Sequence, residues 1–285
     1  MSWEELIKEN KPLVITGTIN AYSALLAERA GIQAIYLSGG GVANASYGLP
    51  DLAMTSREDV LEDVRRIRSA TELPLLVDID TGWGSALSIS RTIKEMISAG
   101  ASGVHIEDQV SEKRCGHRPN KEIVSCAEMV DRIKAAKDAQ TDDNFLLMAR
   151  TDAFAKGGLK EVIDRSNAFI EAGAGAIFPE AISTLKDYED ISKNVSMPIL
   201  ANITEFGMTP LFSHSELANA GVKIVLHPLS AFRAMSKAAE KVYATLASGG
   251  DHEGLLDKMQ TRDELYDVLD YHMYEEKIDK LFEKN

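Results

Sequence analysis

The stretch PLLVDIDTGWGSALSISRTIKEMISAGASGVHIED (residues 74–108) contains the pattern that decides the fold. Two apolar runs, 74–80 and 103–108, enclose an amphipathic segment at 86–99, which is followed by Gly100. The apolar runs are continuous and do not alternate with polar residues, as is typical of parallel strands covered on both faces. Glycine after a helix favours its termination, because it adopts positive φ without steric cost. The stretch therefore predicts a strand–helix–strand unit.

The same pattern recurs along the whole chain. Further apolar runs lie at 13–18, 34–39, 145–151, 175–180, 198–203 and 223–228, and amphipathic segments at 22–30, 57–70, 127–139, 159–172, 184–194, 215–220 and 231–246. Eight strand–helix units with buried parallel strands predict an α/β fold, a (β/α)8 barrel of the TIM type. We expect the barrel over 1–250, and a helical extension of the same domain over 251–285 with helices at 261–270 and 274–283. A doubly wound open sheet is the alternative, but residues 38–41 (SGGG) lack the GxGxxG spacing that it requires.

The composition excludes several classes of function. The 285 residues include 31 basic and 44 acidic side chains, for a formal net charge of −13, which disfavours nucleic acid and anionic membranes as partners. The apolar runs fall short of the roughly 18 residues of a membrane helix. The N-terminal MSWEELIKEN lacks the features of a signal peptide. Two cysteines, Cys115 and Cys126, predict neither a disulfide framework nor a zinc knuckle, and favour the cytoplasm.

Polar residues end nearly all eight apolar runs, where a barrel places its active site. Among them, Asp78 and Asp80 are two apart on one strand and share a face. Two carboxylates with few other protein ligands suit Mg²⁺, which keeps several waters. The equally weighted alternative is that Asp80 caps the following helix while Asp78 pairs with Arg150.

The most informative segment is KRCGHRPNK (113–121). Its cysteine, Cys115, stands among four basic side chains: Lys113, Arg114, His117 and Arg118. Nearby positive charge favours the thiolate, so we expect a lowered thiol pKa. An inert buried thiol is the commoner case and fits Cys126, but a polar loop offers Cys115 no apolar core. This segment belongs to one of two long polar loops, 39–56 and 109–126, that we expect to be binding loops or lids.

Several motifs together carry a family resemblance: LSGGGVA (37–43), GVHIEDQVSEKRCGHRPNK (103–121), MART (148–151), FPEA (178–181), ANITEFG (201–207) and PLSAFRAM (228–235). With them the chain resembles the isocitrate lyase/phosphoenolpyruvate mutase superfamily over essentially its whole length. Within it, KRCGH is typical of the lyase branch, and the similarity is greatest to lyases acting on 2-methylisocitrate. The resemblance implies Mg²⁺-dependent cleavage of (2S,3R)-2-methylisocitrate, a tricarboxylate of propionate catabolism through the methylcitrate cycle, into pyruvate and succinate. It also implies a homotetramer whose subunits exchange the eighth barrel helix.

The resemblance further implies a role for each motif residue. Asp78 and Asp80 hold Mg²⁺ with Glu107 in the outer shell, and Arg150 binds the pyruvate carboxylate. The pyruvate moiety also contacts Ser38, Gly39 and Gly40. The remaining substrate-binding residues are Cys115, Gly116, Glu180, Asn202, Thr204, Arg233 and Arg262.

Catalysis is expected to involve Cys115, Lys113 and His117, with Asp51 also in the active-site loops. Cys115 delivers the proton that completes succinate, and Tyr36 is one candidate for the base that removes the substrate hydroxyl proton. His227 stands where relatives are expected to have an aromatic residue such as tyrosine, which leaves its role open.

Alternative functions remain at the level of sequence. Isocitrate lacks one methyl, worth only about 1–3 kcal/mol of discrimination in an apolar pocket. Four candidate wall residues, Tyr36, Phe178, Leu226 and Pro228, favour the methylated substrate. Oxaloacetate decarboxylation or cleavage of a C–P bond is disfavoured by the intact KRCGH motif. A scaffold without catalysis is disfavoured by the presence of Asp78, Asp80 and Cys115.

Overall fold

The computed structural model describes residues 1–118, 120–251 and 253–282. In a first compact unit, Met1–Phe232, eight parallel strands form one sheet in the order β6-β5-β4-β3-β2-β1-β8-β7. The strands are β1 Leu13–Gly17, β2 Ile35–Leu37, β3 Leu75–Asp78, β4 Gly103–Glu107, β5 Leu146–Thr151, β6 Ala176–Pro179, β7 Leu200–Asn202 and β8 Ile224–His227. A parallel bridge between Ile177 and Ile199 joins β6 to β7 and brings the ends of the sheet together. The predicted barrel is thereby confirmed, and the open-sheet alternative is wrong.

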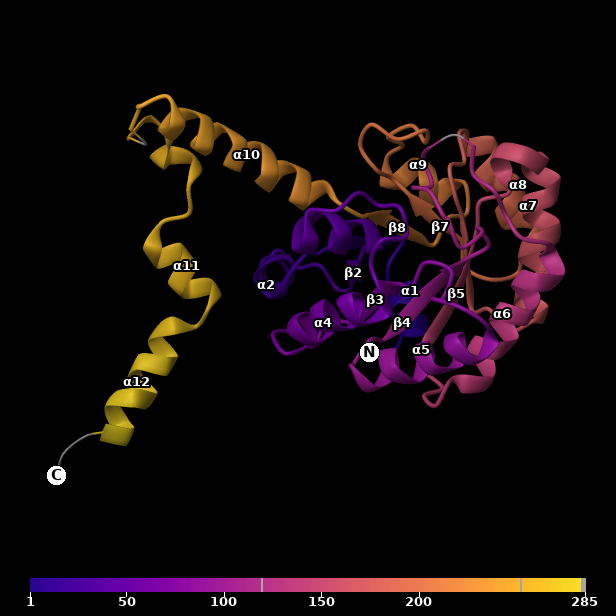
Figure 1. Cartoon of the computed structure of the whole chain (residues 1–285), viewed down its shortest axis with the longest axis horizontal. Coiled ribbons are helices and arrows are strands. Elements are labelled where there is room, and N and C mark those ends of the chain that lie inside the picture. The colour runs from indigo at the N-terminus through magenta and orange to yellow at the C-terminus, as the bar shows by residue number, and fades with distance from the viewer. Residues whose placement is uncertain (119, 252, 283–285) are drawn as a thin grey trace. The chain divides into compact units, whose positions relative to one another are not determined.

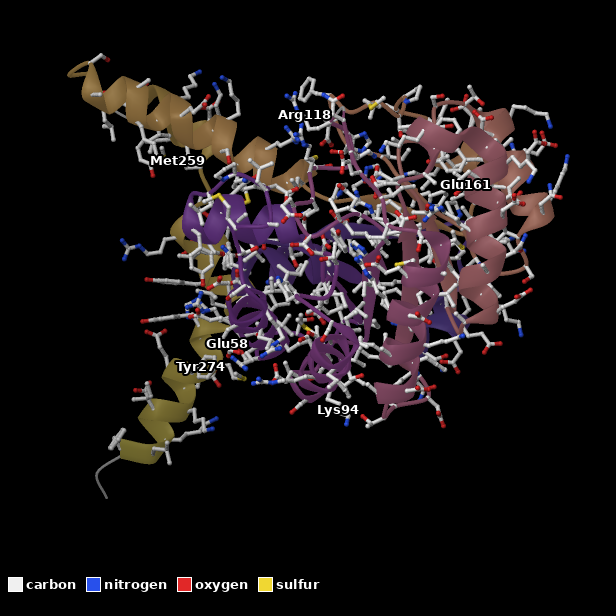
Figure 2. All side chains as sticks on the ribbon, turned by 45° about the vertical axis from the view of Figure 1, so that its right-hand side comes forward. Glu58, Lys94, Arg118, Glu161, Met259 and Tyr274 are labelled. Atoms are coloured by element: carbon white, nitrogen blue, oxygen red, sulfur yellow. The ribbon has the colours of Figure 1, made fainter. Side chains whose placement is uncertain are left out.

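Helices follow the strands and form the outer layer (Figure 1). They are α2 Ala21–Arg29, α4 Arg57–Arg68, α5 Ala86–Ser98, α6 Cys126–Ala139, α7 Phe154–Glu171, α8 Leu185–Asn194 and α9 His214–Asn219, and α1 Trp3–Glu9 precedes β1. Glu58 on α4 and Lys94 on α5, both labelled in Figure 2, lie on the solvent-exposed side of this layer. Capping explains where α4 begins, because the Ser56 hydroxyl accepts a hydrogen bond from the Asp59 backbone and the Asp59 carboxylate accepts from the Ser56 backbone.

The two long polar loops contain local structure. Residues 39–56 include the short helix α3 Gly39–Gly41, which continues into the π-helical turn η1 Val42–Ser46. Within 109–126, Gln109 pairs with Ile123 in an antiparallel bridge, and the amide side chain of Gln109 bonds both backbone groups of Arg114. The described parts of both loops therefore contain local hydrogen-bonded structure.

Two apolar clusters pack against the strands, one outside the barrel and one inside it. Residues such as Val77, Val104 and Ile106 point outward and pack beneath the helices. Inside the barrel a second cluster contains Leu13, Ile15, Tyr36, Leu76, Met148, Phe178, Leu200, Ile224 and Leu226. Because side chains alternate along a strand, each interior residue sets the direction of the side chain two positions later. This alternation aims the polar residues at the strand ends into the barrel mouth.

The second compact unit, Arg233–Asn285, is helical. Its elements are most of α10 Ser230–Ala247, then η2 Glu253–Lys258, α11 Arg262–Val268 and α12 Tyr271–Phe282. Helices were predicted at 261–270 and 274–283, and position 283 lies outside the described residues. α10 stands in the chain where the eighth barrel helix is expected, and the structure records no buried side chain on its described residues. Among the described helices of the chain, none is both long and apolar enough to cross a lipid bilayer.

Candidate active site

The carboxyl ends of five neighbouring strands bring charged and polar side chains together inside the barrel mouth. On β3, Asp78 and Asp80 follow the interior residue Leu76, and on β4 Glu107 follows His105. The other members of this set are Arg150 after β5 residue Met148, Glu180 after β6 residue Phe178, and Asn202 on β7 after Leu200. All of these polar side chains are buried. The strand-end reasoning applied to the sequence therefore located a real cluster.

One side of the cluster is acidic. The Gly39 backbone N–H donates to Asp78 Oδ2 at 3.1 Å, and the Asp80 backbone N–H donates to Asp78 Oδ1 at 3.0 Å. Lys113 Nζ lies 2.7 Å from Asp80 Oδ1 and 2.5 Å from Asp51 Oδ1. A Cβ atom on Gly39 would lie 3.1 Å from both Asp78 Oδ2 and Asp80 Oδ1, so a larger residue would crowd the two carboxylates. Lys113 thus ties the two long loops to the end of β3.

The pKa values of the two aspartates are shifted in opposite directions. Burial raises the pKa of Asp78, but interactions with His105, Lys113 and Arg150 outweigh burial and lower that pKa to about 2. Burial raises the pKa of Asp80 to about 6, where the charge of Lys113 opposes the rise and that of Asp78 adds to it. One charged and one readily neutralised carboxylate is the pattern expected of two like charges held close together.

The structure does not support the capping alternative for these residues. The N-cap of α5 is Ser85, whereas Asp80 adopts a positive φ of 49° before it. In the described part of the chain the ion pairs recorded for Arg150 go to Glu107, Asp152 and Glu180 rather than to Asp78. Neither helix capping nor pairing with Arg150 therefore explains the Asp78–Asp80 pair, and its role in metal binding stays a prediction.

Glu107 provides the test of whether this site fits a cation. Its carboxylate is fully buried, and among the described residues neither of its oxygens accepts a hydrogen bond, while Arg150 Nη1 lies 3.3 Å from Oε2. Burial raises the pKa of Glu107 well above its usual range, although Arg150 and Lys113 oppose the rise. No three acidic, His or Cys side chains of the described residues converge as a ready ligand set. Few protein ligands and unsatisfied carboxylate oxygens suit Mg²⁺, which completes its shell with water and substrate oxygens.

Arg150 forms the opposite side of the cluster. Its Nε and Nη2 donate to Asp152 Oδ2 and Oδ1 at 2.9 and 3.2 Å, and Nη2 lies 3.4 Å from Glu180 Oε2. The guanidinium lies over the Phe178 ring, with its central carbon 5.2 Å from the ring centroid. Asp152 thus already receives the two-point bond that a planar guanidinium makes with a carboxylate, which fixes the orientation of Arg150.

The loop segment Cys115-Gly116-His117 contacts this basic side directly. A Cβ atom on Gly116 would lie 2.4 Å from Arg150 Nη2 and 2.6 Å from the Glu180 side chain. His117 Nε2 lies 3.0 Å from Glu180 Oε1, and its Nδ1 accepts from the Met208 backbone at 2.9 Å. Asn202 Nδ2 lies 3.3 Å from Glu180 Oε1. The structure therefore brings the KRCGH loop to the ends of β5, β6 and β7.

Glu180 is held as a carboxylate by these neighbours. Burial raises the pKa of Glu180, but the charge of Arg150 and the hydrogen bond from His117 outweigh burial and lower that pKa below its usual range. A charged Glu180 is one of three carboxylates that face Arg150, together with Glu107 and Asp152.

The expectation of a lowered pKa at Cys115 is wrong. Burial raises the pKa of its thiol above the usual value, and the charges of Asp51 and Glu180 add to the rise. Arg150 and a backbone hydrogen bond from His117 oppose the rise without overcoming it. Of the basic neighbours counted in the sequence, Lys113 points to carboxylates and Arg118 is exposed. A thiol that keeps its proton is a better acid than nucleophile.

Tyr36 lies deeper in the barrel, between the acidic side and His105. Its hydroxyl is 2.9 Å from His105 Nε2 and donates to Asp78 Oδ2 at 3.4 Å. Burial and the charge of Asp78 raise the pKa of Tyr36 well above its usual range, so tyrosinate is scarce at neutral pH. Burial lowers the pKa of His105 to about 4, and its ring is therefore neutral. The role of Tyr36 as a base stays a prediction.

Several predicted residues lie elsewhere or stay untested. Ser38 and Thr204 are buried at the ends of β2 and β7, and Gly40 faces Asp51. Arg233 and Arg262 belong to the second unit, on α10 and α11, and their part in the site stays a prediction. His227 Nε2 lies 2.9 Å from His214 Nε2 at the end of β8.

Cavities flank both ends of the barrel. One of about 800 Å³ borders the KRCGH loop and is lined by Leu52, Ala53, Ser111, Glu112, Lys113, Arg114 and Arg118. Figure 2 labels Arg118 on this loop. A larger one, of about 1180 Å³, lies at the amino-terminal ends of the strands, beside α1 residues such as Trp3 and Lys8. Of these two cavities, the smaller one adjoins the polar cluster through Lys113.

The sequence reasoning assigned no role to Lys121, Asp152 or His105. Lys121 was one more charge in a polar loop, and Asp152 one more acid at a strand end. Their burial distinguishes them, with Lys121 6% exposed and Asp152 2% exposed. His105 had one usable signal, a histidine within the otherwise apolar run GVHIE.

The barrel fold, the carboxylates at its strand ends and the cysteine loop that lies over them are together typical of one class of (β/α)8-barrel enzymes. The family described as phosphoenolpyruvate phosphomutase matches residues 3–247, and the chain belongs to this family. The chain is 58% identical over 285 residues to the 2-methylisocitrate lyase of Shewanella oneidensis, covering 100% of this chain and 98% of that protein. It is 60% identical over 281 residues to the 2-methylisocitrate lyase of Escherichia coli, covering 98% and 95%.

A solved structure extends the likeness to the fold. Phosphonopyruvate hydrolase, in a complex with oxalate and Mg²⁺, matches with a TM-score of 0.84 and 27% identity, covering 98% of this chain and 97% of that one. The predicted membership of the isocitrate lyase/phosphoenolpyruvate mutase superfamily is confirmed.

Proposed function

We propose that this enzyme cleaves 2-methylisocitrate into pyruvate and succinate, with Mg²⁺ as its metal. The observation that carries the proposal is the position of Cys115-Gly116-His117 against Arg150 and Glu180, opposite the Asp78–Asp80 pair. This arrangement provides a carboxylate-binding guanidinium, a protonated thiol and a carboxylate-rich cation site around one space. The similarity to 2-methylisocitrate lyases over the full chain supports the same reaction.

Asp78 and Asp80 would hold the metal, with Glu107 behind them. When bound, Mg²⁺ supplies Lewis acidity that lowers the pKa of the substrate C2 hydroxyl. The site also needs a group that removes the hydroxyl proton, and Tyr36, whose hydroxyl donates to Asp78, is one candidate.

The chain's own residues account for the rest of the cleavage. Arg150 binds the carboxylate of the pyruvate portion, because its guanidinium is already oriented by Asp152. Loss of the hydroxyl proton turns C2 into the ketone of pyruvate, the C2–C3 bond breaks, and its electron pair passes into the carboxylate next to C3. Donors from Asn202, Thr204 and the basic residues, His117 among them, would stabilise this charge as it develops.

Cys115 then donates its thiol proton to C3 and completes succinate. Its raised pKa keeps the proton in place until the carbanion-like carbon forms. The loop 109–126 excludes water, which would otherwise compete as the proton source.

The preference for the methylated substrate rests on apolar walls. Tyr36, Phe178 and Leu226 are at most 3% exposed and belong to one interior cluster. An apolar wall of this kind discriminates one methyl by about 1–3 kcal/mol. Isocitrate is therefore the principal competing substrate.

The proposal also includes the oligomeric state of the enzyme and its cellular compartment. We infer a cytoplasmic homotetramer in which the eighth helix is exchanged and Arg233 and Arg262 line the substrate site. Supporting it, the described part of α10 has an amphipathic sequence and no buried side chain within its own chain.

The test measures pyruvate release from 2-methylisocitrate and, in parallel, glyoxylate release from isocitrate, both with Mg²⁺. We expect a strong preference for 2-methylisocitrate. Preference for isocitrate would preserve the mechanism and overturn the role of the apolar walls. Activity on neither would refute the proposed function and direct attention to oxaloacetate and phosphonate substrates.

A further inference from the structure

A buried lysine outside the proposed chemistry joins the cysteine loop to the substrate-binding arginine. Lys121 Nζ donates to the Gly116 carbonyl oxygen at 2.6 Å and forms an ion pair with Asp152 Oδ1. Asp152 is the same carboxylate that binds Arg150 through two hydrogen bonds. One ammonium and one carboxylate therefore connect the turn that carries Cys115 to the guanidinium that orients the substrate.

The backbone that carries the Asp152 carboxylate is anchored in the barrel wall. The Asp152 backbone N–H donates to Asp108 Oδ1 at 2.9 Å, and the Thr151 hydroxyl donates to Asp108 Oδ2 at 2.7 Å. Arg165 Nη1, from α7, lies 3.1 Å from the same Asp108 oxygen. Asp108 and Thr151 are completely buried, so these bonds hold the backbone of Asp152 within the barrel wall. The side chain of Asp152 therefore gives the loop a fixed point of attachment.

The backbone before Lys121 is shaped for this purpose. Asn120 adopts a positive φ of 61°, a conformation that asparagine tolerates better than most residues. This residue turns the chain so that the side chain of Lys121 lies inside while Asn120 itself is exposed. Burying an ammonium without satisfying its hydrogen bonds costs several kcal/mol, so the site has to satisfy Lys121 with strong partners, and the Gly116 carbonyl and Asp152 do so.

We propose that Lys121 is a positioning residue, which holds the Gly116 carbonyl against Asp152 and so sets the Cys115 thiol at a fixed place relative to substrate bound by Arg150. The kinetic part of this proposal rests on the proposed lyase function. Removing the ammonium frees the turn without removing any group that touches the substrate. Proton delivery to C3 is then impaired, while substrate binding through Arg150 and Asp152 persists.

The decisive variant is Lys121→Met, which keeps the length of the side chain and removes its charge and donors. A displacement of about 1 Å at a reacting group costs up to about 100-fold in rate, so we expect kcat to fall about 10- to 100-fold with KM changed less than about threefold. The solvent deuterium isotope effect on kcat should rise, because proton delivery becomes slower. The matched control is Lys160→Met, which also removes an ion pair with an aspartate, but from a side chain that is 87% exposed; it should leave every parameter unchanged.

A second readout does not depend on the substrate. In a Cys126→Ser background, alkylation of Cys115 by iodoacetamide should accelerate several-fold in Lys121→Met, because the untied turn exposes the thiol. If the wild-type enzyme releases no pyruvate, the proposed function fails, but this alkylation rate still decides the role of Lys121. If Lys121→Met does not fold, the variant Lys121→Gln takes its place, because glutamine keeps a donor for the Gly116 carbonyl. Lys121→Gln should show smaller changes of the same sign. Wild-type kcat, isotope effect and alkylation rate in a folded Lys121 variant would overturn the proposal.

Discussion

Replacement of Gly116 by alanine tests the geometry of the site most directly. The added Cβ would lie 2.4 Å from Arg150 Nη2 and 2.6 Å from the Glu180 side chain. Contacts of a Cβ are ordinary only from about 3.4 Å, so either the loop or the guanidinium has to move by about 1 Å. Arg150 is held by Asp152 and Glu180, and cannot yield without breaking those ion pairs. We therefore expect both misplacement of Cys115 and disturbance of carboxylate binding.

The magnitude follows from that displacement. A misplacement of about 1 Å costs up to about 100-fold, or about 2.7 kcal/mol of transition-state stabilisation, in kcat/KM for pyruvate release. Overpacking adds about 1–3 kcal/mol of lost folding stability, measured by urea denaturation. The control is Gly254→Ala, where the added Cβ meets nothing within 4 Å. A folded Gly116→Ala enzyme with kcat/KM within about threefold of wild type would refute the placement of this loop over the substrate.

Three further predictions concern acid, metal and pH. Cys115→Ser should bind substrate with similar affinity in calorimetry and lose most turnover, and unchanged turnover would remove Cys115 from proton transfer. EDTA should abolish pyruvate release, and added Mg²⁺ should restore it. Mg²⁺ should also raise the melting temperature of the wild-type protein, and should raise that of Asp80→Asn much less. Equal shifts in the two proteins would exclude Asp80 as a metal ligand. Burial and the charge of His214 lower the pKa of His227, so as pH falls the unfolded chain takes up a proton at this residue before the folded chain does. The free energy of unfolding should therefore decrease as pH drops through the usual histidine range. Urea titrations at pH 7.5 and 5.5 should show a smaller decrease for His227→Tyr, and an equal decrease would show that His227 does not titrate in this way.

Reading strand ends in the sequence was effective because a barrel imposes two simple rules. Strands alternate their side chains, and all their carboxyl ends meet at one mouth. From Asp78, Glu107, Arg150 and Asn202 alone, it was possible to expect a shared site, and the structure gathers these residues. The same rules could not say which of them are in contact, since register and loop positions decide distances.

The acidity of Cys115 shows where reasoning from neighbours in sequence fails. The cysteine lies among basic residues along the chain, but in the folded protein Lys113 forms ion pairs with Asp51 and Asp80. Burial then dominates, and it raises the thiol pKa. Sequence proximity counts charges, whereas a pKa depends on which charges face the group and on how much water it retains.

By itself the sequence determined the class of fold, the strands, the end of the barrel that carries the chemistry and the residue types available there. These properties depend on periodicity and on local chemistry, which neighbouring residues carry. Only the tertiary structure decided that the buried Lys121 joins Gly116 to Asp152, that Asp152 orients Arg150, and that His105 lies beneath Tyr36. The reason is physical: desolvation and ion pairing act through space, between groups that lie far apart along the chain, and folding alone brings them together.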